Sequence, residues 1–132
     1  EEFVFSVIDI VNQKDSNESL SLEQKIAKME DIDMSDIKSP LIVALFYREY
    51  GEMLLDDAKL DKAIDAFLTS QKNYPDNDIY SAKLNYSLAL AYFEKKDQVN
   101  AIVYIDKALS CSFENNDLSN KINFLKGQLA YN

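Results

Sequence analysis

Small side chains recur in this sequence at one fixed interval, and this recurrence restricts the fold more than any other feature. Gly51, Ala89 and Gly127 are equally spaced along the chain, and we call their spacing the repeat interval. Two helix backbones approach closely only where no bulky side chain stands between them, so a small residue at a repeated position marks a repeated helix crossing. We therefore expect all three to be packing positions on the first helices of successive repeats.

Apolar residues around Gly51 are spaced as on one face of a helix. Tyr47, Tyr50 and Leu54 follow one another at steps of three and four residues, which is the helical period. Ser39 and Pro40 precede this run, as an N-cap residue and a first-turn proline do. The pattern predicts a helix that begins at about residue 41.

The same face recurs further along the chain. At the repeat interval, Ala63, Ile64, Phe67 and Ser70 correspond to Ala101, Ile102, Ile105 and Ala108. Short polar connections join the helices in pairs, so the members of each pair lie antiparallel. The sequence predicts one hairpin over 41–75, a second over 79–112, and a final helix over 115–131 that covers the end of the stack. Together these form one repeat domain over 41–132.

Residues 1–40 are predicted to be an N-terminal helical segment and linker that pack on the stack. Phe3–Val11 fits either a helical face or a short strand, and helix is favoured because a single strand would have no partner. Ser21 and Gln24 have the spacing of a capping box, which predicts a short helix near 21–31. A polar linker follows it.

Turn residues are scarce, with two Gly and two Pro in 132 residues. Sandwiches and barrels need many tight turns, and these usually contain Gly or Pro. The predicted fold is therefore all-α: an α–α superhelix of antiparallel hairpins with about six or seven helices.

These residues resemble the tetratricopeptide repeat, a helical-hairpin family. The first copy of the motif is carried by Tyr47, Tyr50, Gly51, Leu54, Ala63, Phe67, Ser70 and Pro75. The second copy retains Leu88, Ala89, Tyr92, Ala101, Ile105 and Ala108, with Asn85 in place of the aromatic and Phe113 in place of the proline. The resemblance covers about residues 44–131, and the repeat interval in this chain is about one helical turn longer than the family's period of about 34 residues.

The resemblance implies a protein-binding module, a scaffold or adaptor whose first helices line a concave groove for a peptide or helix of a partner. The family's groove positions fall on Leu45, Arg48, Glu52, Leu55, Lys83, Tyr86, Leu90, Phe93, Lys121, Phe124, Gln128 and Tyr131. Two alternatives stay open. The N-terminal helices fill the groove, or the open helical ends pair two copies and the chain is a homodimerisation domain.

Charge argues against two classes of partner. The net charge is −9, and Arg48 is the only arginine. A negative field repels phosphate backbones and anionic lipids, and few planar guanidinium groups remain to grip phosphate. We expect no nucleic acid partner. We also expect no direct membrane insertion, because no apolar run approaches the ~20 residues of a membrane-spanning helix.

Catalytic and metal-binding residue types are also scarce. The sequence contains no histidine, and Cys111 is the only cysteine, so the commonest general base and metal ligand are missing. Asp31, Asp33 and Ser35 begin like a calcium loop, but Asp36 stands where that loop needs glycine. We expect no enzyme activity, metal or cofactor. The chain begins with Glu1, and its sequence leaves open its compartment and whether it belongs to a longer protein.

Overall fold

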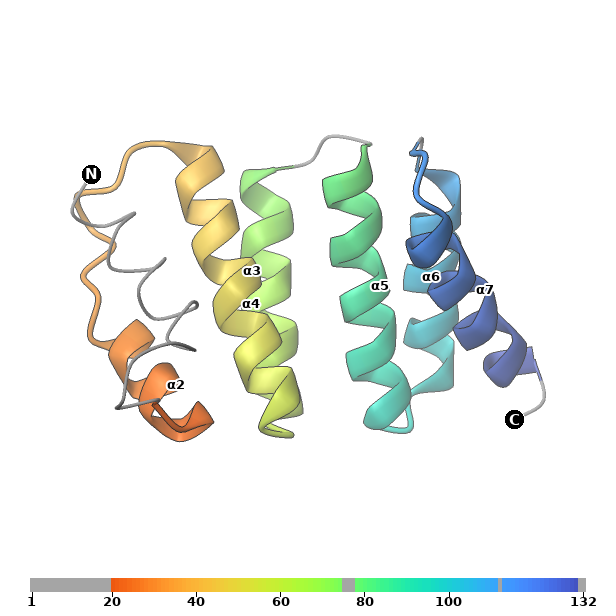
Figure 1. The fold of residues 1–132 in the computed structure, drawn as a ribbon, viewed down its shortest axis with the longest axis horizontal. Coiled ribbons are helices and arrows are strands. Elements are labelled where there is room, and N and C mark those ends of the chain that lie inside the picture. Colours follow the sequence, from red (N-terminus) through yellow and green to blue (C-terminus); the bar gives the residue numbers. More distant parts are fainter. Residues whose placement is uncertain (1–19, 75–77, 112, 131–132) are drawn as a thin grey trace. The chain divides into compact units, whose positions relative to one another are not determined.

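The structure, a computed structural model, describes residues 20–74, 78–111 and 113–130. Within these residues it contains helices and connecting segments and no β-strand. The helices follow one another along the chain (Figure 1). Their bounds are α2 Leu22–Glu30, α3 Pro40–Asp56, α4 Leu60–Asn73, α5 Ile79–Glu94, α6 Gln98–Ser110 and α7 Asn116–Ala130. The predicted all-α class of packed helical hairpins is confirmed.

The helix bounds lie close to those expected from the sequence. The hairpin predicted over 41–75 corresponds to α3 and α4, and the one predicted over 79–112 corresponds to α5 and α6. The final helix predicted over 115–131 is α7.

The N-terminal expectation is tested only in part. The helix predicted near 21–31 is α2, and the linker that follows it contains no helix. Phe3–Val11, Pro75 and Tyr131 lie outside the described residues, so the choice between helix and strand for the first segment stays a prediction.

The chain divides into two compact units, Glu1–Asn73 and Tyr74–Asn132. We call these unit 1 and unit 2. Unit 1 contains α2, α3 and α4, and unit 2 contains α5, α6 and α7.

Local capping sets where the helices of unit 1 begin. The Oγ atom of Ser39 accepts a hydrogen bond from the N–H of Ile42 at 3.4 Å, and Pro40 occupies the first helical position of α3. In front of α2, the Oγ of Ser21 accepts from the Gln24 N–H at 3.2 Å, and the Gln24 side chain accepts from the Ser21 N–H at 2.9 Å. Both predicted caps are confirmed, and each satisfies amide groups that have no partner inside the helix.

The crossing of α3 and α4 depends on Gly51. A Cβ atom placed on Gly51 would lie 2.6 Å from the Cε1 atom of Phe67, which is far inside van der Waals contact. The Phe67 ring is fully buried and fills the space that the glycine leaves. Gly51 is therefore a packing position, as its spacing predicted.

Polar contacts add to this packing in unit 1. The Ser70 hydroxyl donates a buried hydrogen bond of 2.6 Å to the carbonyl oxygen of Ala44, which links α4 to α3. On α2, the Glu30 carboxylate accepts from the Tyr50 hydroxyl at 2.5 Å and lies 3.9 Å from the ammonium of Lys62. Burial, and then this carboxylate, raise the pKa of Tyr50, so it remains a neutral donor.

Unit 2 repeats the hairpin with a different pair of side chains. Ala89 and Ile105 follow Gly51 and Phe67 at the repeat interval, and both are buried in the same cluster. On the first helix alanine is larger than the equivalent glycine of unit 1, and on the second helix isoleucine is smaller than the equivalent phenylalanine. The cluster consists of Ala82, Ala89, Ala101, Ile105, Ala108, Leu118, Ile122, Leu125 and Leu129.

Helix α7 packs against α6 and, less extensively, against α5. It contributes Leu118, Ile122, Leu125 and Leu129 to the cluster. Gly127 does not share this role, because nothing lies within 4 Å of a Cβ atom placed on it. Two residues of helix turn the side-chain direction by about 200°, so Gly127 lies on the side of α7 away from Leu125 and Leu129. The expectation that Gly127 is a packing position is wrong.

The turns inside the two hairpins have the same backbone conformation. Ala58 and Lys96, which are also separated by the repeat interval, have positive φ angles of 59° and 70°. In the first turn the N–H of Lys59 donates to the carbonyl of Leu54 at 2.9 Å and that of Ala58 to Leu55 at 3.0 Å, which is the Schellman pattern. A left-handed conformation is unfavourable for residues with a Cβ atom.

The two glycines give opposite predictions. Replacing Gly51 with Ala pushes a methyl group into Phe67 and should lower the free energy of unfolding by about 1–3 kcal/mol. Gly127→Ala adds a better helix former in open space and should raise it by about 0.5–1 kcal/mol. Urea unfolding followed by circular dichroism measures both. The double variant Gly51→Ala/Phe67→Ile copies the Ala89–Ile105 combination and should recover most of the loss. Equal effects of the two single alanine variants would contradict this packing.

The turn conformation gives a second prediction. Ala58→Gly and Lys96→Gly should each raise the free energy of unfolding by about 0.5–1 kcal/mol, because glycine adopts a positive φ without strain. Ala27→Gly, at an exposed position inside α2, is the matched control and should lower it. Thermal unfolding of the three variants measures these changes in stability. If all three substitutions destabilise the chain, the two turns carry no strain.

The cap of α5 gives a third prediction, on pH. The pKa of Asp78 is lowered mainly by the hydrogen bond from the Tyr74 hydroxyl, and also by the N–H groups of Ser81 and Tyr80. A lowered pKa in the folded state means that the carboxylate contributes stability at pH values above 3.8, its ordinary value, and that this contribution is lost as the pH falls through the lowered pKa. Asp78→Ala should cost about 1 kcal/mol at neutral pH.

The control for this cap is Asp78→Asn, which keeps an acceptor at the N-cap but does not titrate. Its free energy of unfolding should fall less on acidification than that of the unaltered chain. An identical acid dependence in the two proteins, measured by urea unfolding between neutral pH and pH values below 3.8, would exclude this role of Asp78.

Candidate functional site

The sequence-predicted groove positions fall on α3, α5 and α7, and so on both units. Those on α3 are Leu45, Arg48, Glu52 and Leu55, and those on α5 are Lys83, Tyr86, Leu90 and Phe93. Those on α7 are Lys121, Phe124 and Gln128, while Tyr131 lies outside the described residues. Each unit therefore presents its own part of the predicted set.

In unit 1 the predicted positions are mostly covered. Leu45 is 41% exposed, whereas Arg48, Glu52 and Leu55 are half-buried. An Nη atom of Arg48 lies 3.4 Å from the carboxylate of Glu49, its neighbour in the chain. This part of the set offers one accessible apolar side chain.

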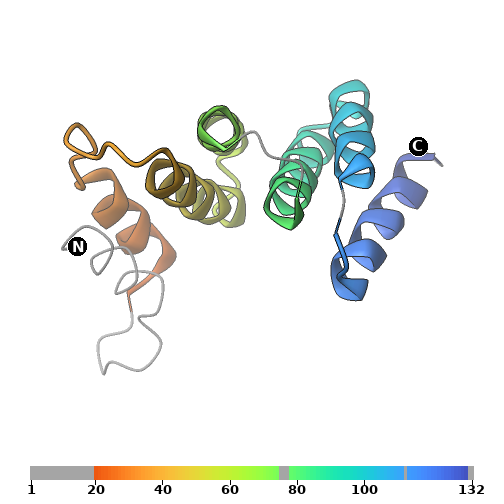
Figure 2. The ribbon, with the colours of Figure 1, turned by 90° about the horizontal axis from the view of Figure 1, so that it is seen from above.

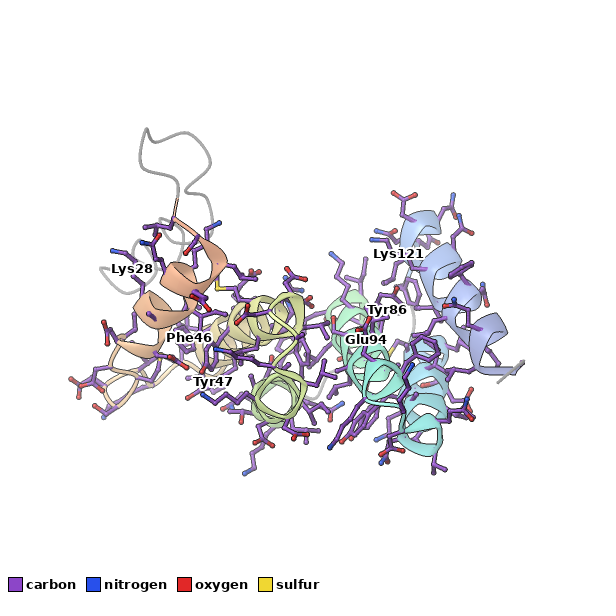
Figure 3. The ribbon with its side chains drawn as sticks, turned by 90° about the horizontal axis from the view of Figure 1, so that it is seen from below. Lys28, Phe46, Tyr47, Tyr86, Glu94 and Lys121 are labelled. Atoms are coloured by element: carbon purple, nitrogen blue, oxygen red, sulfur yellow. The ribbon has the colours of Figure 1, made fainter. Side chains whose placement is uncertain are left out.

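In unit 2 the predicted positions lie on α5 and α7, and we call this set of residues the α5–α7 face: Lys83, Tyr86, Leu90, Phe93, Lys121, Phe124 and Gln128. Viewed from above, α5 and α7 stand on either side of α6 (Figure 2). Tyr86, Leu90 and Phe93 are half-buried and pack against the apolar cluster to which α7 contributes. Figure 3 shows Tyr86 and Lys121 on the facing sides of α5 and α7.

Phe124 is the most unusual residue of this face. Its side chain is 69% exposed, although it lies on a helix whose buried side is completed by Leu118, Ile122, Leu125 and Leu129. Phe124 therefore leaves a large apolar surface in water without supporting the core. Exposed aromatics of this kind are typical of contact surfaces, because a ring buries much area while few torsions are frozen.

Two lysines give one end of the face a positive charge. Lys83 and Lys121 are both exposed and are separated by the repeat interval, so they occupy equivalent positions of α5 and α7. Among the described residues, neither ammonium group is within ion-pair distance of a carboxylate. Asp117 lies one turn before Lys121, in the first turn of α7, where a carboxylate complements the helix dipole.

The other end of the face leads to an open hollow of about 710 Å³ lined by Phe93, Lys96, Asp97, Gln98 and Val99. Only Phe93 belongs to the residues predicted from the sequence. The other four lie in the turn between α5 and α6 and in the first turn of α6. There Asp97 caps α6, because its side chain accepts a hydrogen bond from the N–H of Asn100 at 3.2 Å. The available sequence signal was Val99, an apolar residue in the otherwise polar first turn of α6.

A second apolar surface lies on the outer side of α6, and sequence reasoning missed it. Val99 is 75% exposed, and Ile102 and Val103 are each 43% exposed. The buried side of α6 is formed by Ala101, Ile105 and Ala108, so these three residues form a separate stripe, which we call the α6 stripe. Beside it, a hollow of about 180 Å³ is lined by Ile102, Ile105, Asp106, Lys126, Leu129 and Ala130.

The titratable groups with shifted pKa values serve local structure. Hydrogen bonds lower the pKa of Asp33, which accepts from Ser35 in a turn, and that of Asp97. Burial, together with the charge of Asp78, raises the pKa of the Cys111 thiol. Within the described residues no group of three His, Cys, Asp or Glu side chains is arranged to hold a metal ion.

Within the ranges that the structure describes, each helix is too short or too polar to span a lipid bilayer. Comparison with models of protein families, with curated proteins and with solved structures finds no match. The α5–α7 face therefore has to be interpreted from its own chemistry. It combines half-buried rings, one exposed ring and two ammonium groups, and such a surface can bury an apolar side chain of a partner and pair with its carboxylates.

Proposed function

We propose that this chain is a protein–protein interaction module of the tetratricopeptide-repeat type, a scaffold or adaptor that binds a peptide or helix of another protein on the α5–α7 face. The observation that supports this most directly is the exposure of Phe124 on α7, a helix whose buried side belongs to the same cluster against which the half-buried Tyr86 and Leu90 pack. Fully burying a phenylalanine side chain contributes about 1.5–3 kcal/mol, so a partner that covers Phe124 gains a substantial part of its affinity from one contact.

The repeated geometry supports the family assignment within this proposal. Small residues meet large ones at equivalent positions of the two hairpins, and both hairpins close with the same Schellman turn. The α3 positions contribute less to the proposal, because only Leu45 is well exposed. We assign the chain a binding role without catalysis, since it has no histidine and Asp33, Asp78 and Asp97 are occupied in caps and turns.

Binding of a random-peptide display library to the full chain tests the proposal. Phe124→Ala should reduce the affinity for the selected peptides at least about tenfold, because truncation of a central aromatic contact typically costs more than about 1 kcal/mol. Its free energy of unfolding should change by less than about 0.5 kcal/mol, as is usual for exposed sites. Val103→Ala, on the outer side of α6, is the matched control and should leave binding unchanged. A library that yields no peptide dependent on Phe124 would refute this function.

Self-association is the second candidate, and a separate observation favours it. The α6 stripe exposes Val99, Ile102 and Val103 on one side of unit 2, and a two-fold pairing would place two such stripes together. Stable dimers bury about 800 Å² on each partner, and three aliphatic side chains supply only a small part of that area, so this candidate ranks second. Sedimentation equilibrium over a range of concentrations tests it, and a monomer at the highest concentration excludes it.

A further inference from the structure

Two basic side chains lie on the α5–α7 face of a chain that is acidic as a whole. The net charge of the chain is −9, yet the end of the face near the start of α5 presents Lys83 and Lys121, neither of them paired with a carboxylate in the described residues. Tyr86, half-buried, is one turn from Lys83 on α5, and Phe124, exposed, is one turn from Lys121 on α7. Two ammonium groups thus border an aromatic surface.

Charges close to a bound partner determine which partner binds, whereas the net charge of the chain acts on a partner that is still distant. At physiological ionic strength the screening length is about 8 Å, so a group docked at this end interacts mainly with the two lysines and with Asp117, one turn before Lys121. The acidic remainder of the chain repels an acidic partner only weakly at larger distances. An acidic segment therefore gains binding free energy by neutralising the two exposed ammonium groups. A basic or neutral segment does not.

The two ends of the face differ, which gives it a direction. The far end carries Glu94, which is exposed and labelled in Figure 3, and it opens into the hollow lined in part by Phe93 and Val99. Ten residues of helix separate Lys83 from Phe93, a distance of about 15 Å along the axis. An extended peptide covers that distance in about five residues.

We infer that the segment bound on the α5–α7 face is acidic at one end and carries a bulky apolar residue at the other. Its carboxylates lie against Lys83 and Lys121, and its apolar side chain enters the hollow at Phe93, about five residues away if the segment is extended and about ten if it is helical. This inference rests on the proposed function and adds to it the chemical class of the partner and the direction in which the partner lies.

The library selection tests the inference when the selected sequences are compared across three forms of the full chain. With the unaltered chain, we expect Asp and Glu to be enriched several-fold over the starting library, at a fixed separation from an aromatic or leucine residue. With Lys83→Glu/Lys121→Glu, we expect these peptides to bind at least tenfold more weakly and a new selection to enrich Lys and Arg instead. This reversal is compared with a selection on the matched control of equal net charge, because an unfolded acidic chain also attracts basic peptides.

The matched control is Lys38→Glu/Lys72→Glu, which changes two exposed lysines of unit 1 and gives the chain the same net charge. It should retain the acidic peptides with unchanged affinity. A loss equal to that of the first double variant would show that the overall charge acts rather than the face, and would overturn the inference.

The remaining outcomes separate this inference from the proposed function. Peptides that depend on Phe124 but show no preference for acidic residues would overturn the inference and leave the binding role intact. A selection that yields no Phe124-dependent peptide would overturn both.

Discussion

The fold depends on the reciprocal packing of small and large side chains where the two helices of each hairpin cross. In the first hairpin Gly51 lets the Phe67 ring lie directly against the backbone of α3. In the second, the equivalent positions hold Ala89 and Ile105, both buried in one cluster. Because the loss of volume on one helix is matched by a gain on the other, two different pairs of residues produce the same helical hairpin.

This packing also determines which surfaces remain available. Each hairpin uses one side of its first helix to contact the second helix, and α7 contributes only the side formed by Leu118, Ile122, Leu125 and Leu129. Gly127 is open and Phe124 is exposed on α7. The buried side of α7 and the exposed ring of Phe124 are therefore separated around the circumference of one helix.

Local signals in the sequence predicted the helices well because capping and helical periodicity involve residues close together in the chain. Ser39 with Pro40, and Ser21 with Gln24, make the bonds that their spacing indicated. The repeat interval located both hairpins but misassigned Gly127. An interval identifies equivalent positions, and it carries no information on whether a neighbouring helix lies against each of them.

The sequence predicted which residues make up the candidate site, but it did not predict how exposed each side chain is. Family resemblance selected Tyr86, Phe93 and Phe124 alike, and the structure shows that only Phe124 is largely exposed. The α6 stripe was missed because Val99, Ile102 and Val103 fit the apolar pattern of an ordinary buried helix side. Distinguishing the two sides of α6 requires knowing which of them faces α5, and that is a tertiary property.

The most direct test of the account is a map of where a selected peptide contacts the full chain, obtained from backbone amide chemical shifts in two-dimensional NMR spectra. The account predicts that titration shifts the amides of Tyr86, Leu90 and Phe124 and that of Val99 at the edge of the hollow, while those of Ile102 and Val103 move little. Shifts concentrated on Ile102 and Val103, with Tyr86 and Phe124 unaffected, would contradict it.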